Sequence, residues 1–236
     1  MVLMLVLAAV LLVVGCAYAQ PDPEEARRRM VEEQIRSRGV QAPRVLDAML
    51  EVPRHEFVSP GDVDRAYGDG PLPIGHGQTI SQPYIVALMT ELADPGPDER
   101  ALEIGTGSGY QAAVLSRLVS HVYTIEIVEP LAEAAADTLE RLGYDNITVR
   151  AGDGYRGWPD QAPFDLIVVT AAPDEVPQTL VDQLAIGGRM VVPVGAQHEV
   201  QELQLLEKRP EGSLETRDVL EVRFVPMVRG RTNPLR

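Results

Sequence analysis

The chain has 236 residues and a formal net charge of −14, from 35 acidic and 21 basic side chains. This length suits one α/β domain with a few additions, and a hydrophobic content of 45% is enough for a sizeable core. The acidic balance argues against nucleic acid as a partner, because neutralising phosphates requires a basic face. The single cysteine, Cys16, excludes an intramolecular disulfide, and the scattered histidines lack the spacing of metal ligands, so we expect no bound metal.

Residues 1–19 carry no charge and are almost entirely apolar, which predicts a targeting segment outside the fold. Ala17-Tyr18-Ala19 matches the cleavage site of an ordinary signal peptide, whereas Val13-Val14-Gly15-Cys16 resembles a lipobox in which Cys16 becomes lipidated. No basic residues precede the apolar run, and this weakens both interpretations. The run is also just long enough for a retained membrane anchor. We expect an exported, periplasmic protein, with a cytoplasmic location as the alternative.

The sequence of residues 26–92 predicts helices separated by irregular segments. Apolar stripes and first-turn prolines predict helices over residues 26–38, 43–50 and 83–92. Residues 51–58 are expected to form a turn and an extended piece. The glycines and prolines of 60–79 predict a packed loop. Ser81 or Gln82 is placed to cap the third helix.

From residue 95 onwards, short apolar runs alternate with helical patterns, as in a parallel α/β sheet. Strands are predicted over 101–104, 121–126, 147–150, 164–169 and 190–194. Helices are predicted over 110–118, 130–142 and 176–184, the last closed by Gly187-Gly188. The segments 199–206 and 219–225 alternate apolar and polar residues, which is typical of antiparallel strands.

The most informative stretch is 101–110, a predicted strand followed by a glycine-rich turn and a helix. The next strand ends in Glu126. This arrangement builds a pocket for an adenosine group at the carboxyl edge of a parallel sheet. Glycines at 105, 107 and 109 let the backbone turn sharply and approach a ligand. The Glu126 carboxylate can accept both hydroxyls of a ribose.

The glycine spacing favours S-adenosylmethionine (SAM) over a dinucleotide. The dinucleotide fingerprint G-x-G-x-x-G needs a third glycine at position 110, which is tyrosine, and no lysine follows as in a phosphate-binding loop. The pattern E-x-G-x-G-x-G, starting at Glu103, is the first motif of SAM-dependent methyltransferases. An acid at Glu103 suits a ligand with an ammonium and a sulfonium group. We therefore predict cofactor contacts from Glu103, Gly105, Gly107, Ser108 and Glu126, with a nucleotide cofactor and a purely structural turn as alternatives.

Three further segments are candidates for the same pocket. Asp153 and Gly154 follow the third strand, where an acid can accept from an adenine amino group, although Asp-Gly is also a common turn. Thr170 begins a loop of small residues after the fourth strand, which leaves room for a substrate or forms an ordinary strand-to-helix loop. Thr79 and Ser81 form a pair of hydroxyls that can fold over the pocket, although Ser81 alone is better explained as a helix cap.

Taken together, these segments resemble the protein-L-isoaspartate (D-aspartate) O-methyltransferase family. The matching stretches are 30–35, 45–49, 52–58, 77–83, 102–110, 189–195 and 224–226. The glycine motif is shared by many methyltransferases. The Thr-Ile-Ser-Gln-Pro loop at 79–83 and the Val-Pro-Arg-His segment at 52–55 are far more specific to this family.

The resemblance implies a Rossmann-like class I SAM-dependent methyltransferase. Its α/β fold has a mostly parallel seven-stranded sheet, an N-terminal helical cover and C-terminal antiparallel strands. A single domain over 20–236 would then comprise the cover and active-site loop (26–94), the core (95–195) and the C-terminal strands (196–236). The implied reaction moves a methyl group from SAM to the free carboxylate of L-isoaspartyl and D-aspartyl residues in damaged proteins. Ser81 matches the family's active-site serine, with Thr79 and Thr170 as substrate-binding candidates.

Such a reaction needs no general base, because a carboxylate is already ionised at neutral pH. The resulting methyl ester returns to a succinimide. We expect damaged proteins or peptides as the partners and a monomer, with membrane contact only through an N-terminal lipid or anchor. Most members of the family are cytosolic, so the N-terminus departs from the usual pattern and leaves the source of SAM open. The alternatives are a SAM-dependent methyltransferase with a small-molecule or nucleic-acid substrate, a NAD-linked oxidoreductase and a noncatalytic protein of this fold.

Overall fold

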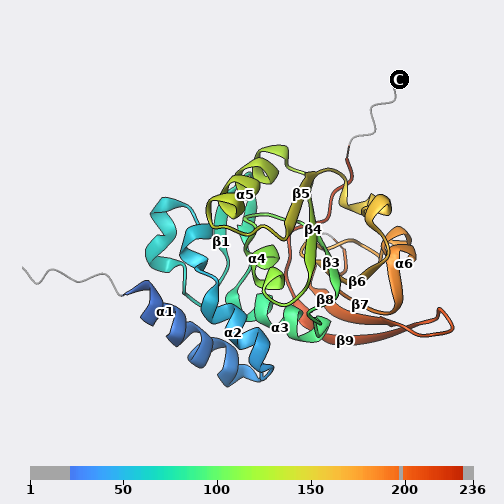
Figure 1. Ribbon diagram of the computed structural model, residues 1–236, viewed down its shortest axis with the longest axis horizontal. Coiled ribbons are helices and arrows are strands. Elements are labelled where there is room, and N and C mark those ends of the chain that lie inside the picture. Colours follow the sequence, from blue (N-terminus) through green and yellow to red (C-terminus); the bar gives the residue numbers. More distant parts are fainter. Residues whose placement is uncertain (1–21, 197–198, 231–236) are drawn as a thin grey trace, which may run out of the picture.

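The computed structural model describes residues 22–196 and 199–230, so the predicted targeting segment lies outside the described residues. A seven-stranded sheet with helices on both faces forms its centre (Figure 1). The strands are β3 (Arg100–Ile104), β4 (His121–Glu126), β5 (Ile147–Ala151), β6 (Phe164–Val169), β7 (Leu184–Val194), β8 (Gln201–Lys208) and β9 (Leu214–Val222). The order is β5-β4-β3-β6-β7-β8-β9, parallel from β5 to β7 and antiparallel at the β7–β8 and β8–β9 pairs. The predicted fold class is confirmed.

Both faces of the central strand β6 are buried, which explains its nearly continuous apolar sequence. In β6, Leu166 and Val168 belong to one hydrophobic cluster, whereas Ile167 and Val169 belong to the other. The first cluster takes in side chains of α3 (Pro83–Ala93), α4 (Tyr110–Ser116) and α5 (Glu129–Arg141). The second takes in α6 (Gln178–Gln183) and Trp158, between the short helices η5 (Gly154–Arg156) and η6 (Pro159–Gln161). The central strands therefore hold the carboxyl edge of the sheet rigidly between two cores.

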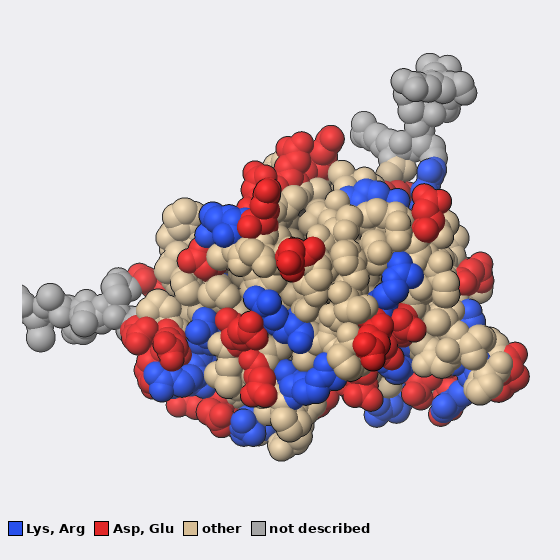
Figure 2. Space-filling model, in the orientation of Figure 1, with Lys and Arg blue, Asp and Glu red and all other residues tan. Residues whose placement is uncertain are grey.

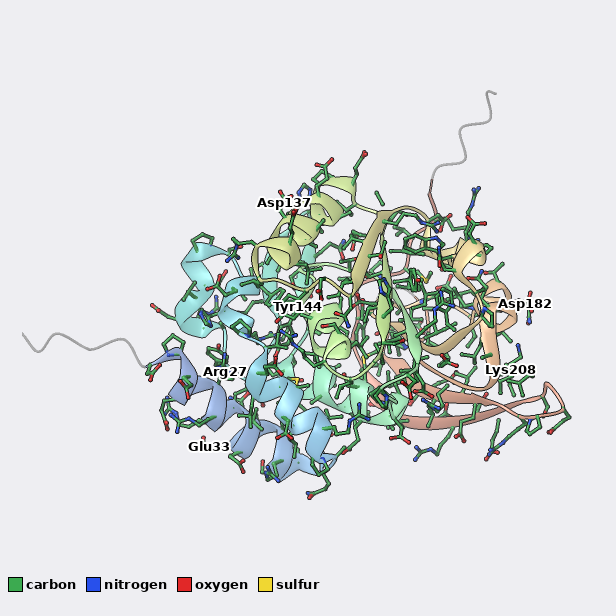
Figure 3. The ribbon with its side chains drawn as sticks, viewed as in Figure 1. Arg27, Glu33, Asp137, Tyr144, Asp182 and Lys208 are labelled. Carbon is green, nitrogen blue, oxygen red and sulfur yellow. The ribbon has the colours of Figure 1, made fainter. Side chains whose placement is uncertain are left out.

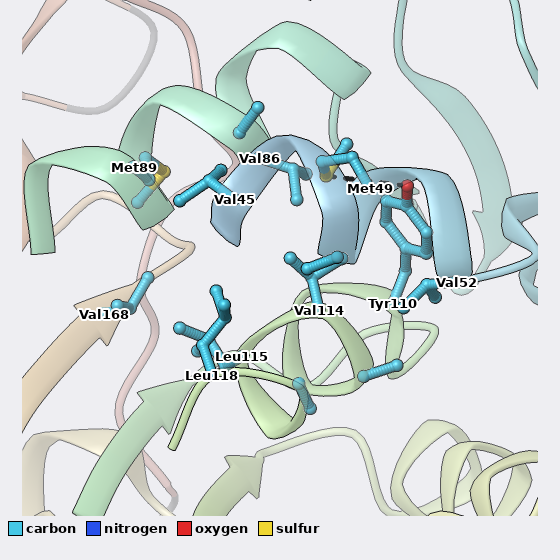
Figure 4. Packing of buried hydrophobic residues seen from close by; sticks show 14 of the residues in the cluster. Val45, Met49, Val52, Val86, Met89, Tyr110, Val114, Leu115, Leu118 and Val168 are labelled. Atoms are coloured by element: carbon cyan, nitrogen blue, oxygen red, sulfur yellow. Dashed lines mark hydrogen bonds between the residues drawn. The ribbon is translucent and has the colours of Figure 1, made fainter. Parts of the chain in front are cut away.

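The N-terminal helices form the predicted cover over the first cluster. The helical stretch begins as α1 (Pro23–Arg29), continues through η1 (Met30–Ile35) and η2 (Arg36–Arg38), and ends at Gly39, whose φ is +100°. The second helix, α2 (Pro43–Glu51), crosses α3 and α4 (Figure 4). In that view Met49 meets Tyr110, whose hydroxyl lies 3.9 Å from the Met49 sulfur. The cover thereby packs directly against the residue that follows the glycine turn.

Residues 51–80 differ from the prediction in two places. Arg54–Phe57 form a short 3-10 helix, η3, where an extended piece was expected. The expected loop over 60–79 contains a 3-10 helix, η4 (Pro60–Arg65), and a hairpin of β1 (Leu72–Gly75) and β2 (Gln78–Ile80). The hairpin turn needs three successive residues with positive φ, namely +89° at Gly75, +52° at His76 and +71° at Gly77. Its glycines supply this turn rather than breaking up the structure.

The C-terminal third also differs in its boundaries. Gly187-Gly188 do not close a helix, because α6 stops at Gln183 and β7 begins at Leu184 and runs through them. A Cβ at Gly188 would lie 2.9 Å from the Ala185 carbonyl oxygen, so the strand passes too close for a side chain. The last strand ends at Val222 rather than at residue 225. Its first half is exposed and gives no hydrophobic signal.

The surface mixes both signs of charge, with acidic side chains gathered over α5 at the top of Figure 2. Lys208 of β8 lies beside α6 in Figure 3, and its ammonium donates to the carbonyls of Val181 and Leu184 at 2.9 and 2.8 Å. A cation at this end satisfies carbonyls that the helix itself leaves unpaired. Within 22–196 and 199–230, the helices are too short or too polar to cross a membrane.

Candidate active site

A cleft lies at the carboxyl edge of the sheet, where β3, β4 and β6 end. Its empty volume, counting the open mouth, is about 940 Å³, which falls in the range of cofactor pockets. The walls come from the hairpin strand β2, the glycine turn, the end of β4, the loop after β6 and the C-terminal segment 225–228. Of the predicted site residues, Asp153 alone is missing from these walls; those present are Thr79, Ser81, Glu103, Gly105, Gly107, Ser108, Glu126, Gly154 and Thr170.

The glycine turn is held against the loop after β6. Gly105 has φ +97°, and a Cβ there would lie 2.4 Å from the Thr170 hydroxyl oxygen. That hydroxyl is 2.6 Å from the Gly105 carbonyl, to which it donates. Ser108 follows in the turn, and its hydroxyl accepts from the Tyr110 N–H at 3.3 Å. Thr170 and Ser108 thus fix the turn that forms the floor of the cleft.

Glu126 stands at the end of β4 with only 5% of its surface exposed. One carboxylate oxygen accepts from the Gly107 N–H at 2.8 Å, and the other accepts from the Val128 N–H at 3.0 Å. Each oxygen keeps a further lone pair for another donor. A pair of ribose hydroxyls therefore fits the carboxylate without displacing its backbone contacts.

Glu103 is completely buried in the wall of the cleft. One oxygen accepts from the Thr124 hydroxyl at 2.5 Å, and the other has no hydrogen-bond partner among the described residues. Burial raises the pKa of this carboxyl to about 8, a shift that Thr124 opposes and the negative charge of Glu126 reinforces. An unpartnered buried oxygen is costly, and a cationic N–H donor in the cleft would satisfy it. The carboxyl oxygens of Glu103 and Glu126, as acceptors, therefore fit a ligand with an ammonium group and a ribose.

The loop after β5 carries two predicted site residues, Asp153 and Gly154, and only Gly154 lines the cleft. Gly154 lies in the wall, where a Cβ would approach Cγ2 of Ile104 to 2.4 Å. Asp153 instead caps the short helix η5, accepting from the Tyr155 N–H at 2.9 Å. This contact is the kind expected if Asp153-Gly154 form an ordinary turn, which was the alternative interpretation of the sequence. Its contact with an adenine amino group stays a prediction.

Ser81, Thr79 and Thr170 lie where the cleft meets a second groove. This groove is bordered by all three and by the segment 220–225. Ser81 is not a helix cap, because Gln82 occupies the N-cap position of α3. The Gln82 amide donates to Asp69 at 2.6 Å instead of capping the helix. The three hydroxyl residues are thus brought together between the cofactor side and the groove.

Comparison with known proteins identifies the family. The model of the protein-L-isoaspartate(D-aspartate) O-methyltransferase family matches residues 25–232. The chain belongs to this family. A protein-L-isoaspartate O-methyltransferase of Gloeobacter violaceus is 58% identical over 200 residues, which cover 85% of this chain and 97% of that protein. The predicted family and enzyme class are confirmed.

Solved structures agree. A protein-L-isoaspartate O-methyltransferase structure superposes with a TM-score of 0.78 at 35% identity, covering 85% of this chain and 65% of that one. A Plasmodium falciparum protein assigned to the same enzyme class gives a TM-score of 0.75 at 25% identity, with 86% and 99% of the two chains covered. That protein was solved with S-adenosyl-L-homocysteine. The chain is a SAM-dependent methyltransferase, as the glycine motif predicted.

Several residues of this methyltransferase site were missed from the sequence. Segment 225–228 closes one side of the cleft, tied down where Ala172 donates to the Val225 carbonyl at 2.8 Å and Met227 donates to the Ala172 carbonyl at 2.7 Å. It was expected to continue a strand up to residue 225. Gln111 also lines the cleft from α4. Neither carries a local signal, because only the folded chain brings them to the sheet edge. Within 22–196 and 199–230, the acidic and histidine side chains form no cluster suited to a metal ion.

Proposed function

We propose that this chain repairs damaged proteins by methylating the free carboxylate of L-isoaspartyl and D-aspartyl residues, with Ser81 as the orienting residue. One observation carries the assignment of roles: Ser81 lines both the cofactor cleft and the adjoining groove. A peptide in the groove would present a side-chain or main-chain carboxylate to the cleft at this junction. Thr79 and Thr170 border the same opening.

The groups around this junction suit a reaction in which a positive and a negative charge neutralise each other. SAM, when bound, supplies an electrophilic methyl group. Glu126 and Glu103 would hold its ribose and ammonium groups, and the Ser81 hydroxyl would orient the substrate carboxylate. Catalysis then rests on alignment rather than on a base. Segment 225–228 and the hairpin strand β2 form two walls of the cleft, and a cofactor and a substrate bound between them would displace water and weaken the solvation of the reacting charges.

A paired-peptide assay tests this function directly. Tritiated methyl transfer is measured to a peptide with one isoaspartyl residue and to its twin with a normal aspartyl residue. We expect base-labile methyl incorporation into the first peptide only. Equal labelling of both peptides, or of neither while a small molecule in an extract is methylated, would contradict the assignment.

The role of Ser81 is tested by Ser81→Ala. The loss of a hydrogen bond to a charged group is worth about 1.5–3 kcal/mol, so transfer should fall roughly 10- to 150-fold while S-adenosylhomocysteine binding is kept. Ser213→Ala is the matched control, since Ser213 lies in the β8–β9 turn, where its hydroxyl donates to the neighbouring Glu211. Equal activity of Ser81→Ala and the parent would exclude the orienting role.

We also propose that residues 1–19 direct the chain out of the cytoplasm, on the strength of their apolar sequence and the two processing sites around Cys16 and Ala19. The mass of the mature N-terminus, measured after expression of the full chain, distinguishes cleavage after Ala19 from lipidation at Cys16. An unprocessed chain recovered in the cytoplasmic fraction would refute export.

A further inference from the structure

Arg54 is a fully buried cation directly behind the active-site loop. Its Nε donates to the Ala66 carbonyl and its Nη2 to the Ser81 carbonyl, both at 2.7 Å. The guanidinium carbon lies 4.9 Å from the ring centroid of Tyr110, a residue that lines the cleft. In the part of the chain that the structure describes, Nη1 has no hydrogen-bond partner and no ion pair includes Arg54.

The charge survives burial. Desolvation lowers the pKa of Arg54, and Tyr110 and Tyr67 raise it again in part, which leaves it at about 10. The guanidinium therefore stays protonated at neutral pH. A buried charge without an ionic partner carries a desolvation cost that two carbonyl contacts do not fully return. Fastening the loop at Ser81 requires donors but no charge. The carbonyls and the Tyr110 ring offset the cost of burying this cation only in part, and an anion bound in the adjoining cleft explains the remaining charge better.

We propose that Arg54 is a positioning residue that makes the substrate end of the cleft electropositive, so that the site prefers an ionised carboxylate to its neutral methyl ester. This assignment rests on the proposed function. The guanidinium is bonded to the Ser81 carbonyl, so a carboxylate held by the Ser81 hydroxyl would lie roughly 8–10 Å from it. Arg38 and Arg223 also line the groove at its surface, and Arg54 adds a buried cation directly behind Ser81.

The change of charge during the reaction makes this attraction act on the substrate but not on the product. A carboxylate oxygen forms a bond to the methyl carbon, the carbon–sulfur bond breaks, and its electron pair stays on sulfur. The negative charge of the substrate disappears in the same step. Arg54 therefore attracts the carboxylate but not the ester, which favours release of the product.

Binding of two matched peptides separates this role from a structural one. One peptide carries an isoaspartyl carboxylate and the other an isoasparaginyl amide of the same shape without charge. Both are titrated by calorimetry in the presence of S-adenosylhomocysteine, so that no transfer occurs. A unit charge roughly 8–10 Å away at an effective dielectric of about 20 corresponds to a preference of about 15- to 30-fold for the carboxylate. The parent should show this preference, and Arg54→Met should lose most of it.

Arg44 provides the control, because its guanidinium also bonds two carbonyls, those of Pro95 and Leu118 at 2.7 and 2.8 Å. These carbonyls lie near the amino ends of β3 and β4, away from the cleft. Arg44→Met should be destabilised but keep the parent's preference. Arg54→Gln, which retains a donor for one carbonyl, replaces Arg54→Met if the latter does not fold.

Three results would overturn the role of Arg54. The parent binds both peptides equally; a neutral Arg54 variant weakens both peptides by the same factor; or Arg44→Met loses the preference to the same extent. The failure of the proposed function alone is separate, because it would show as a parent that binds the carboxylate peptide selectively and never methylates it. A parent that binds neither peptide would overturn both proposals.

Discussion

Replacing Glu126 by Gln changes one polar group in the wall of the cleft and has two distinguishable consequences. The carboxylate oxygens accept from the N–H groups of Gly107 and Val128. An amide offers one oxygen only, so its NH2 group must face one of these donors. Leaving a buried backbone N–H unsatisfied costs about 1–3 kcal/mol, and this cost falls on the stability of the protein without ligand.

The second consequence falls on cofactor binding. The NH2 group of the glutamine cannot accept from a ribose hydroxyl, and the remaining oxygen has lost its charge. The loss of one hydrogen bond to a charged group amounts to about 1.5–3 kcal/mol, or a roughly 10- to 150-fold weaker Kd. Calorimetry with S-adenosylhomocysteine measures the Kd, and urea unfolding measures the stability.

Glu129→Gln is the control, because it makes the same chemical change at an exposed position nearby in the chain, at the start of α5. This variant should keep both the Kd and the stability of the parent, within about twofold and about 0.5 kcal/mol. If Glu126→Gln bound S-adenosylhomocysteine as tightly as this control does, Glu126 would not be the ribose acceptor.

Three further predictions concern the walls of the cleft. Gly154→Ala places a Cβ 2.4 Å from Cγ2 of Ile104 and 3.2 Å from Cε of Met227, so it should cost about 1–3 kcal/mol in urea unfolding and weaken S-adenosylhomocysteine binding; an unchanged midpoint would contradict the close packing. Glu103 keeps its proton in the folded chain up to about pH 8, because burial raises its pKa from the ordinary value of 4.5. Between these two pH values the unfolded state binds fewer protons than the folded state, so the stability of the parent should fall with rising pH relative to Glu103→Gln and level off above about pH 8. A difference in stability between parent and Glu103→Gln that does not change with pH would show that the buried carboxyl is ionised. Tyr155→Phe removes the 3.2 Å bond from the Tyr155 hydroxyl to the Met227 carbonyl, worth about 0.5–1.5 kcal/mol, so amide exchange at Met227 should accelerate roughly 2- to 12-fold, and an unchanged rate would mean that this bond does not hold the segment.

The sheet and the glycine turn could be predicted because their signals are local. Strand β6 is buried on both faces and has a continuous apolar sequence, and the glycines of the turn have positive φ at Gly105, Gly107 and Gly109. The hairpin of β1 and β2 was missed because its short strands lie among glycines and prolines, which also describe an irregular loop. Segment 225–228 was missed because its partner, Ala172, is distant in the chain.

The site residues show the same limit. Glu103, Gly105 and Glu126 were placed correctly in the cleft, because the motif itself defines the end of a strand. Asp153 follows the neighbouring strand but does not line the cleft; one of its carboxylate oxygens caps η5, and its contact with adenine stays a prediction. Arg54 stands in a segment that was matched to the family, yet an arginine in a sequence suggests a surface residue. Its burial depends on contacts with three other segments, which contribute Ala66, Ser81 and Tyr110.

The two ends of the cleft carry opposite charges, and this division matches a reaction between two ions. Glu126 supplies the negative charge at the cofactor end, and Glu103 joins it when an ammonium group such as that of SAM takes the place of its proton. Arg54 lies behind Ser81 at the end where a carboxylate would enter. Methyl transfer removes the positive charge on sulfur and the negative charge on the substrate together. Both products are then held less strongly than both reactants, so the same side chains that assemble the reacting pair also favour its release. A protein with an acidic surface needs such a local arrangement, because its average charge attracts only one of the two partners.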